Sequence, residues 1–480
     1  MTALRTAAMR GTIWLTGGQY VGSAIAIAGN IWLARLLGPE PFGAFFVVSS
    51  TVEAVFLLAS FSFGQHLVQA PAVTRAHCRA AVFYASGMSA LLIVGAACAQ
   101  WAVGSRFTAS TLTLFLLLTM VRAAWNVSLT VSFLLERMMA YRALAACRMA
   151  AAIAGAGLAI AVGYLGGGVW SLLAREAGMV VAGSAAVWIA VKRVVVFAPD
   201  DPEAAPYRDV WRFGCRLSGV QMLELAAHRL DGVLLGSLLG PGHAVALGYY
   251  AQAKYISSLP NLIVDAGSRL VAHRVYAILR DDRTAVRRAV IAAQFWVLRA
   301  LVPIALVLFV CASGLFRATM GPRWTDGGVV LQAMCFSGCF LVLFNNLKVL
   351  RLTFEDWAGL YRAYLVQFCV LAVGMAVAVP LAGAIGGGVA YTVANAAGLV
   401  MMSAKLNVLP DFAAQMRNIG VPLAAAALAA TIVTLAGVGS PERWVAPAVY
   451  ALGLYTVAWG AMERRQLSMS LRGLRRSVSA

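Results

Sequence analysis

Residues 289–316 read AVIAAQFWVLRALVPIALVLFVCASGLF and contain one charged side chain, Arg299. A helix needs about 20 apolar residues to cross the roughly 30 Å of hydrocarbon in a bilayer, so this stretch is long enough to span a membrane. Arg287 and Arg288 precede it directly. Because basic residues are retained on the cytoplasmic side, the stretch is expected to start there.

Stretches of the same kind fill nearly the whole chain. The protein is 61% hydrophobic and 12% charged, whereas soluble proteins carry about 25% charged residues. The sequence therefore predicts an all-α polytopic membrane protein with about 14 transmembrane helices. The expected spans are 11–34, 42–66, 80–104, 108–135, 143–165, 168–191, 213–239, 244–268, 289–316, 327–350, 359–380, 384–406, 419–437 and 444–462.

The connections between these stretches are alternately rich and poor in basic residues. Most of the Lys and Arg residues, Arg351 among them, fall in connections on one side, which predicts that both termini are cytoplasmic. The net charge is +19. We expect the basic residues to set the topology and to contact anionic phospholipids on the cytoplasmic face, and we do not expect them to bind nucleic acid. The opposite side has five basic residues: Arg35, Arg106, Arg317, Arg323 and Arg443.

Two short signatures occur once in each half of the chain. Residues 36–39 and 238–241 both read Leu-Leu-Gly-Pro, and Gly-Gly-Gly-Val occurs at 166–169 and at 386–389. Each signature occurs at the same span number within its half of the chain. This predicts two parallel six-helix repeats around a central cleft, an arrangement suited to alternating access. The expected parts are an N-terminal lobe (1–197), a cytoplasmic linker (198–212), a C-terminal lobe (213–406), and helices 13–14 with a basic tail (407–480).

Charged residues inside the spans are the candidates for function. Such residues cost at least about 2.5–3.5 kcal/mol at mid-bilayer, so they are expected to face a cavity or a partner. Arg175 and Glu176 lie about one-third into span 6. The others are Glu53, Arg122, Arg216, Glu224, Arg229, Asp231, Lys254, Asp265 and Arg299.

Two interpretations of these charges remain open. They can form interhelical ion pairs, with Asp231 or Glu53 as partner of Arg229 and with Asp265 or Glu224 as partner of Lys254. Alternatively, they line a cationic cleft for an anionic headgroup, a ligand that the forked guanidinium of arginine suits. In that case the substrate-binding residues are Arg122, Arg229, Lys254 and Arg299, and the candidates for ion coupling are Glu53, Glu224, His228 and Asp231.

The spacing within span 7 adds one expectation. On a continuous helix, Glu224, His228 and Asp231 share one face. Arg122, by contrast, has no acidic residue within a turn on its own helix, so its anion must come from another helix or from a ligand.

Three segments carry a family resemblance. Residues 35–43, RLLGPEPFG, resemble the first hairpin of the Wzx-type polysaccharide transporters of the multidrug/oligosaccharidyl-lipid/polysaccharide exporter superfamily. Residues 135–142 resemble the family's cytoplasmic start of span 5, and residues 229–260 the start of its second lobe. The resemblance covers roughly residues 10 to 405.

The resemblance implies a flippase of the bacterial inner membrane. Its substrate would be an undecaprenyl-pyrophosphate-linked oligosaccharide, moved to the periplasmic leaflet for O-antigen, capsule or exopolysaccharide synthesis. The family commonly binds the pyrophosphate with basic cavity residues, which here implies Arg122, Arg229 and Lys254. His228 stands where many relatives carry Asn. The implied partners are the lipid-linked oligosaccharide, the polymerase and other polysaccharide-assembly proteins.

Other functions are weighed against this one. The chain has no GxxxxGK[ST] motif for ATP, and Cys335 and Cys339 alone make no zinc site, so no cofactor or metal is expected. A multidrug/cation antiporter of the same superfamily is the nearest alternative. A membrane polymerase or ligase would need larger external loops, so no enzymatic activity is expected. A scaffold for a synthase complex is a further alternative.

Overall fold

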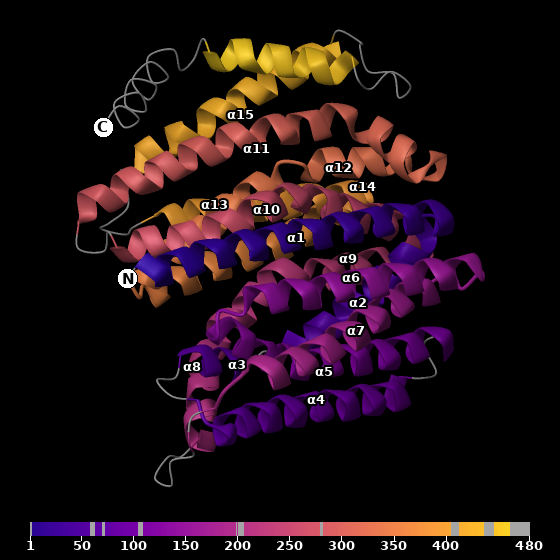
Figure 1. Ribbon diagram of the computed structural model, residues 1–480. Coiled ribbons are helices and arrows are strands. Elements are labelled where there is room, and N and C mark those ends of the chain that lie inside the picture. Colours follow the sequence, from indigo (N-terminus) through magenta and orange to yellow (C-terminus); the bar gives the residue numbers. More distant parts are fainter. Residues whose placement is uncertain are drawn as a thin grey trace. The chain divides into compact units, whose positions relative to one another are not determined.

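The computed structural model describes residues 2–57, 63–69, 73–103, 109–197, 199, 206–278, 282–404, 412–435 and 446–460. Nearly all of these residues are helical (Figure 1). The first group of helices is α1 (Thr2–Leu37), α2 (Pro39–Leu57), α3 (Phe63–Gln69), α4 (Arg75–Val103), α5 (Ala109–Arg137), α6 (Tyr141–Tyr164), α7 (Trp170–Val194), α8 (Pro206–Arg229) and α9 (Asp231–Leu239). The remaining elements are η1 (Pro241–His243), α10 (Ala244–Ile278), α11 (Arg283–Met320), η2 (Pro322–Trp324), α12 (Gly327–Met334), α13 (Ser337–Thr353), α14 (Trp357–Ser403) and α15 (Phe412–Leu435).

Nine segments among the described residues are long and apolar enough to cross a membrane. One of them, α14, contains two of the predicted spans, and its helix is interrupted between them at Ala382 and Gly383. The chain is therefore an all-helical membrane protein, as predicted from its hydropathy.

Contacts divide the chain into two compact units. The first consists of Met1–Ala251 with Leu371–Pro380, and the second of Gln252–Val370 with Leu381–Ala480. The first unit extends past the predicted linker because α8 packs against α3 and α4, and α9 packs against α2. Residues 206–212 of the predicted linker form the first turns of α8. The two predicted repeat lobes stay a prediction.

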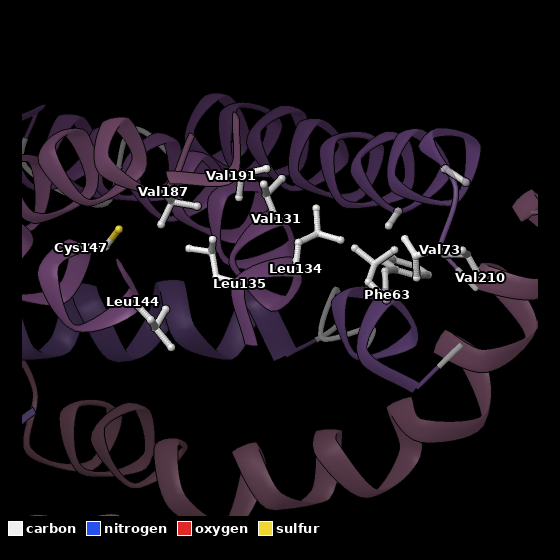
Figure 2. Packing of buried hydrophobic residues seen from close by; sticks show 13 residues of the cluster. Phe63, Val73, Val131, Leu134, Leu135, Leu144, Cys147, Val187, Val191 and Val210 are labelled. Carbon is white, nitrogen blue, oxygen red and sulfur yellow. The ribbon is translucent and has the colours of Figure 1, made fainter. Parts of the chain in front are cut away.

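A cluster of buried apolar residues holds one end of the first unit together (Figure 2). Phe63 and Leu67 of α3 contribute to it, and so does Val210, where the start of α8 crosses α4 (Figure 1). The rest of the cluster comes from the segment before α4 and from α4, α5, α6 and α7: Val73, Ala80, Ala81, Val131, Leu134, Leu135, Leu144, Cys147, Val187 and Val191. Where such contacts lie within a bilayer, they are stabilised by close van der Waals packing, because lipid tails are as apolar as these side chains.

The predicted span 213–239 is occupied by α8, which ends at Arg229, and α9, which begins at Asp231. Leu230 between them keeps right-handed helical dihedral angles (φ −76°, ψ −9°), and its carbonyl accepts a hydrogen bond from the amide of Leu234 at 2.9 Å, so the irregularity is confined to one residue. The shared face of Glu224, His228 and Asp231 stays a prediction. Gly232 and Gly236 let α9 approach α2 closely: a Cβ on Gly232 would lie 2.6 Å from the Cβ of Ser50.

The Gly-Pro signature behaves as predicted in both halves. Gly38 and Gly240 have φ values of 78° and 77°, which favour glycine, and each is followed by a proline that begins the next helical element. A third junction of this kind, at Gly321-Pro322, was not singled out in the sequence. The Gly-Gly-Gly signature differs: Gly166 and Gly168 form a turn, whereas residues 386–388 lie inside α14, beyond the break at Gly383.

A second pair of matching turns supports the repeat. Between α5 and α6, the amide of Ala140 donates to the carbonyl of Leu135 at 2.9 Å. Between α13 and α14, the amide of Asp356 donates to the carbonyl of Arg351, also at 2.9 Å. Both turns contain a non-glycine residue with positive φ, Met139 in the first and Glu355 in the second, so the same connection is built twice.

The repeat-related glycines of α2 and α10 contact each other's helices. A Cβ built on Gly43 would lie 2.7 Å from the carbonyl carbon of Ala244 and 2.7 Å from the amide nitrogen of Gly248. A Cβ on Gly248 would lie 2.8 Å from the carbonyl carbon of Pro39. The obstacles are backbone atoms, so these two helix starts approach each other as closely as glycine allows.

In the second unit, the Arg351 side chain connects the end of α13 to two other segments. Its side chain is 2% exposed and donates to the carbonyl oxygen of Met402 from Nε and Nη2, at 3.0 and 2.8 Å. It also donates to the carbonyl oxygen of Ala404 and forms an ion pair with Asp356, which caps the start of α14. The expectation that Arg351 is a topology-setting surface charge is corrected: it joins the end of α13 to both ends of α14.

Candidate functional site

Three arginines and two glutamates form one network in the first unit. Arg122 on α5 contacts Glu53 on α2 at 3.6 Å and Glu176 on α7 at 3.2 Å. Glu53 also contacts Arg229, the last residue of α8, at 3.3 Å. Glu176 also contacts its neighbour Arg175 at 3.2 Å. Four helices thus meet through charged side chains, and three positive charges face two negative ones.

The network has a buried end and an accessible end. The Glu176 side chain is 9% exposed, and Arg175 is held further by the amide oxygen of Asn30 on α1, at 3.1 Å. The Glu53 side chain is 23% exposed, and that of Arg229 is 54% exposed. Ion pairs at the buried end are screened least, so they are the more permanent ones.

The network has one more arginine than it has glutamates, and Arg122 and Arg229 both contact the carboxylate of Glu53. In addition, the Nε of Arg122 is buried and has no hydrogen-bond partner among the residues that the structure describes. A buried donor without a partner costs about 1–3 kcal/mol, which an incoming acceptor would recover. The arrangement can therefore bind an anion that reaches Arg122 and Arg229 together.

The structure gives both arginines partners on other helices. Glu53, one of the two partners expected for Arg229, forms an ion pair with it. Arg122 contacts Glu53 and Glu176, which lie on two other helices. Glu176 and Arg175 were noted as charges within span 6 but were not nominated for the site. Their signal was the cost of a charge inside a span, the same signal that selected Arg122.

Asp231 and the other residues of span 7 have different surroundings. Asp231 is fully buried and accepts a hydrogen bond from the hydroxyl of Tyr250 at 2.7 Å. The ring of Tyr250 lies 5.6 Å from that of Phe46 on α2. Glu224 and His228 are half-buried on α8. The side chains of Arg216 and Asp265 lie outside the described residues.

The other two nominated cations belong to the second unit. The Lys254 ammonium group lies 5.0 Å from the centre of the Tyr391 ring. Arg299 stacks on the ring of Phe295 at 3.6 Å and donates to the carbonyl oxygen of Phe295 and to the amide oxygen of Asn418, at 3.1 and 3.3 Å. Arg299 thereby links α11 to α15. The substrate-binding role of all four cations stays a prediction.

The sequence pattern of one protein family, described as "Polysaccharide biosynthesis protein", matches residues 32–327. The chain belongs to this family. A comparison with curated proteins finds no match. The family match begins within α1 and ends at the start of α12, so it includes all five charged residues of the network.

Solved structures of membrane transporters share the fold. The lipid II flippase MurJ, in an inward closed conformation, is similar with a TM-score of 0.67 and 11% identity, over 95% of this chain and 100% of that chain. An inward-facing multidrug resistance MATE transporter gives a TM-score of 0.55 and 16% identity, over 85% of this chain and 98% of that chain. A point mutant of the Vibrio cholerae MATE transporter VcmN gives 0.53 and 14%, over 88% and 98%. These similarities show that the chain shares the fold of these transporters.

Proposed function

We propose that this protein moves an undecaprenyl-pyrophosphate-linked oligosaccharide from the cytoplasmic to the periplasmic leaflet of the bacterial inner membrane, by alternating access. The observation that carries the proposal is the network in which Arg122 and Arg229 share the Glu53 carboxylate. A pyrophosphate group offers the negative charge and the paired oxygens that two guanidinium groups bind well. The family assignment supports a role in polysaccharide synthesis.

The proposal includes the orientation and the partners. Both termini are cytoplasmic, and the basic cytoplasmic connections contact anionic phospholipids. The polymerase and other polysaccharide-assembly proteins receive the translocated substrate. The protein carries out transport and no covalent chemistry on the sugar.

A multidrug/cation antiporter is the second candidate. The similarity to MATE structures favours it, and Glu53 and Glu176 provide carboxylates of the kind that a cation would need. The excess of arginine in the network argues against it, because a cationic drug would be repelled from Arg122 and Arg229.

The deciding measurement is the leaflet distribution of lipid-linked oligosaccharide in cells that lack the gene. The intermediate is expected to accumulate on the cytoplasmic face, and the wild-type gene is expected to clear it. Arg122→Ala and Arg229→Ala should reduce the flux at least about tenfold, because a charge-assisted hydrogen bond is worth about 1.5–3 kcal/mol. Arg193→Ala, which removes an exposed cation from α7, is the matched control and should transport normally.

Protein levels in the membrane are measured for each variant, so that loss of flux is separated from loss of protein. If the intermediate reaches the periplasmic leaflet without the gene, the flippase proposal is wrong. Increased drug sensitivity of the same cells would then favour the antiporter.

A further inference from the structure

Glu53 contacts two arginines in the way that a phosphate group would. Its Oε1 lies 3.6 Å from Nη2 of Arg122, and its Oε2 lies 3.3 Å from Nη1 of Arg229. These arginines come from α5 and α8, so the two carboxylate oxygens bridge two helices. Phosphate groups also present oxygens on more than one side, and guanidinium groups bind carboxylate and phosphate with the same fork geometry.

The second carboxylate of the network is not equivalent to the first. Glu176 is nearly buried and is bound by Arg122 and by Arg175, which is itself held by Asn30. An incoming anion would have to displace Glu176 from two arginines at a site with little access. Glu53 is more exposed, and its partner Arg229 is more than half exposed. Exchange of ligands on the arginines is therefore easier at Glu53.

The charge balance favours exchange at this position. With Glu53 in place, the five charged groups sum to one net positive charge, three arginines against two glutamates. A diphosphate carries more negative charge than one carboxylate and offers more acceptor oxygens. It can therefore satisfy Arg122 and Arg229 better than Glu53 does, including the buried Nε of Arg122, which lacks an acceptor among the described residues.

We propose that Glu53 is an internal competitor for the anionic headgroup, and that a diphosphate binds by displacing the Glu53 carboxylate from Arg122 and Arg229. This inference rests on the function proposed above, and it adds a residue that sets affinity from within the protein. Competition of this kind keeps both arginines paired at every stage, and it limits how tightly the headgroup is held, which favours release.

The proposal predicts that removing the charge of Glu53 tightens the binding of an anion. In Glu53→Gln, a neutral amide of nearly the same size replaces the carboxylate, and both arginines lose a competing anion. The variant should bind inorganic pyrophosphate more tightly than the wild type, with a Kd about tenfold lower, as expected for the loss of one charge-assisted contact. A carboxylate that served only to build the site would give the opposite result.

The experiment is a calorimetric titration of the full-length protein in lipid nanodiscs with inorganic pyrophosphate, at fixed pH and ionic strength. Glu40→Gln is the matched control, because Glu40 is exposed on the same helix and its replacement removes the same charge. This control should bind as the wild type does. Combining Glu53→Gln with Arg229→Ala should remove the gain. Should Glu53→Gln fail to fold, Glu53→Ala removes the same competitor.

Two results overturn the proposal: equal or weaker binding by both Glu53 variants, and an equal gain in Glu40→Gln. The outcome is independent of the leaflet assay. Pyrophosphate could bind neither wild type nor Glu53→Gln while cells without the gene accumulate the intermediate. In that case the proposed competitor role of Glu53 is wrong and the proposed flippase function stands. If Glu53→Gln binds pyrophosphate more tightly while those cells accumulate no intermediate, the proposed anion site stands and the proposed flippase function is wrong.

Discussion

Replacing Gly43 with alanine is expected to destabilise the protein by about 1–3 kcal/mol, the usual cost of inserting a methyl group into a closely packed site. The added Cβ would lie 2.7 Å from the carbonyl carbon of Ala244 and from the amide nitrogen of Gly248. These are backbone atoms of α10, so no side chain can turn away to make room. The start of α2 must separate from α10. Reversible unfolding in mixed micelles, followed by circular dichroism, measures the loss.

Gly87→Ala is the matched control for this prediction. Gly87 is also a helical glycine, on α4, and a Cβ there would meet nothing within 4 Å. Alanine is a better helix former than glycine by about 1 kcal/mol, so this variant should be neutral or slightly stabilised. Equal stability of the two variants would show that α2 and α10 do not approach each other at Gly43.

Replacing Arg351 with methionine is expected to cost about 3–5 kcal/mol, the usual result of removing one partner from a buried ion pair. Methionine fills most of the volume but leaves the Asp356 carboxylate without its cation. The carbonyl oxygens of Met402 and Ala404 lose their donor as well. The ends of α13 and α14 should then separate. The same unfolding measurement, with limited proteolysis near residue 404, detects both effects.

Arg362→Met provides the control, because it removes the same charge from an exposed position on α14. Arg362 donates to the carbonyl oxygen of Ala358 on its own helix, at 3.2 Å. Its loss should change the stability by less than about 0.5 kcal/mol. If both variants lose the same amount of stability, the effect comes from net charge, and the proposed link between helix ends is wrong.

The sequence alone determined the fold class and selected several residues of the candidate site. Hydropathy is a local property, and a span of about 20 apolar residues has few alternatives to a membrane helix. The same reasoning selected Glu53, Arg122 and Arg229, since charges are costly inside a span and stand out against apolar neighbours. The Gly-Pro junctions were also readable, because φ near 78° favours glycine at Gly38 whatever surrounds it.

Only the tertiary structure decided which groups meet. The pairing of Arg122 with Glu176 depends on how α5 lies against α7, and no spacing along the chain contains that information. The close approach of Gly232 to Ser50 likewise depends on how α9 packs against α2, which local sequence does not reveal. Arg351 shows the limit most clearly. As a basic residue at a helix end it reads as a topology signal, yet carbonyl groups some fifty residues away bury it, because a desolvated cation needs acceptors that only folding assembles.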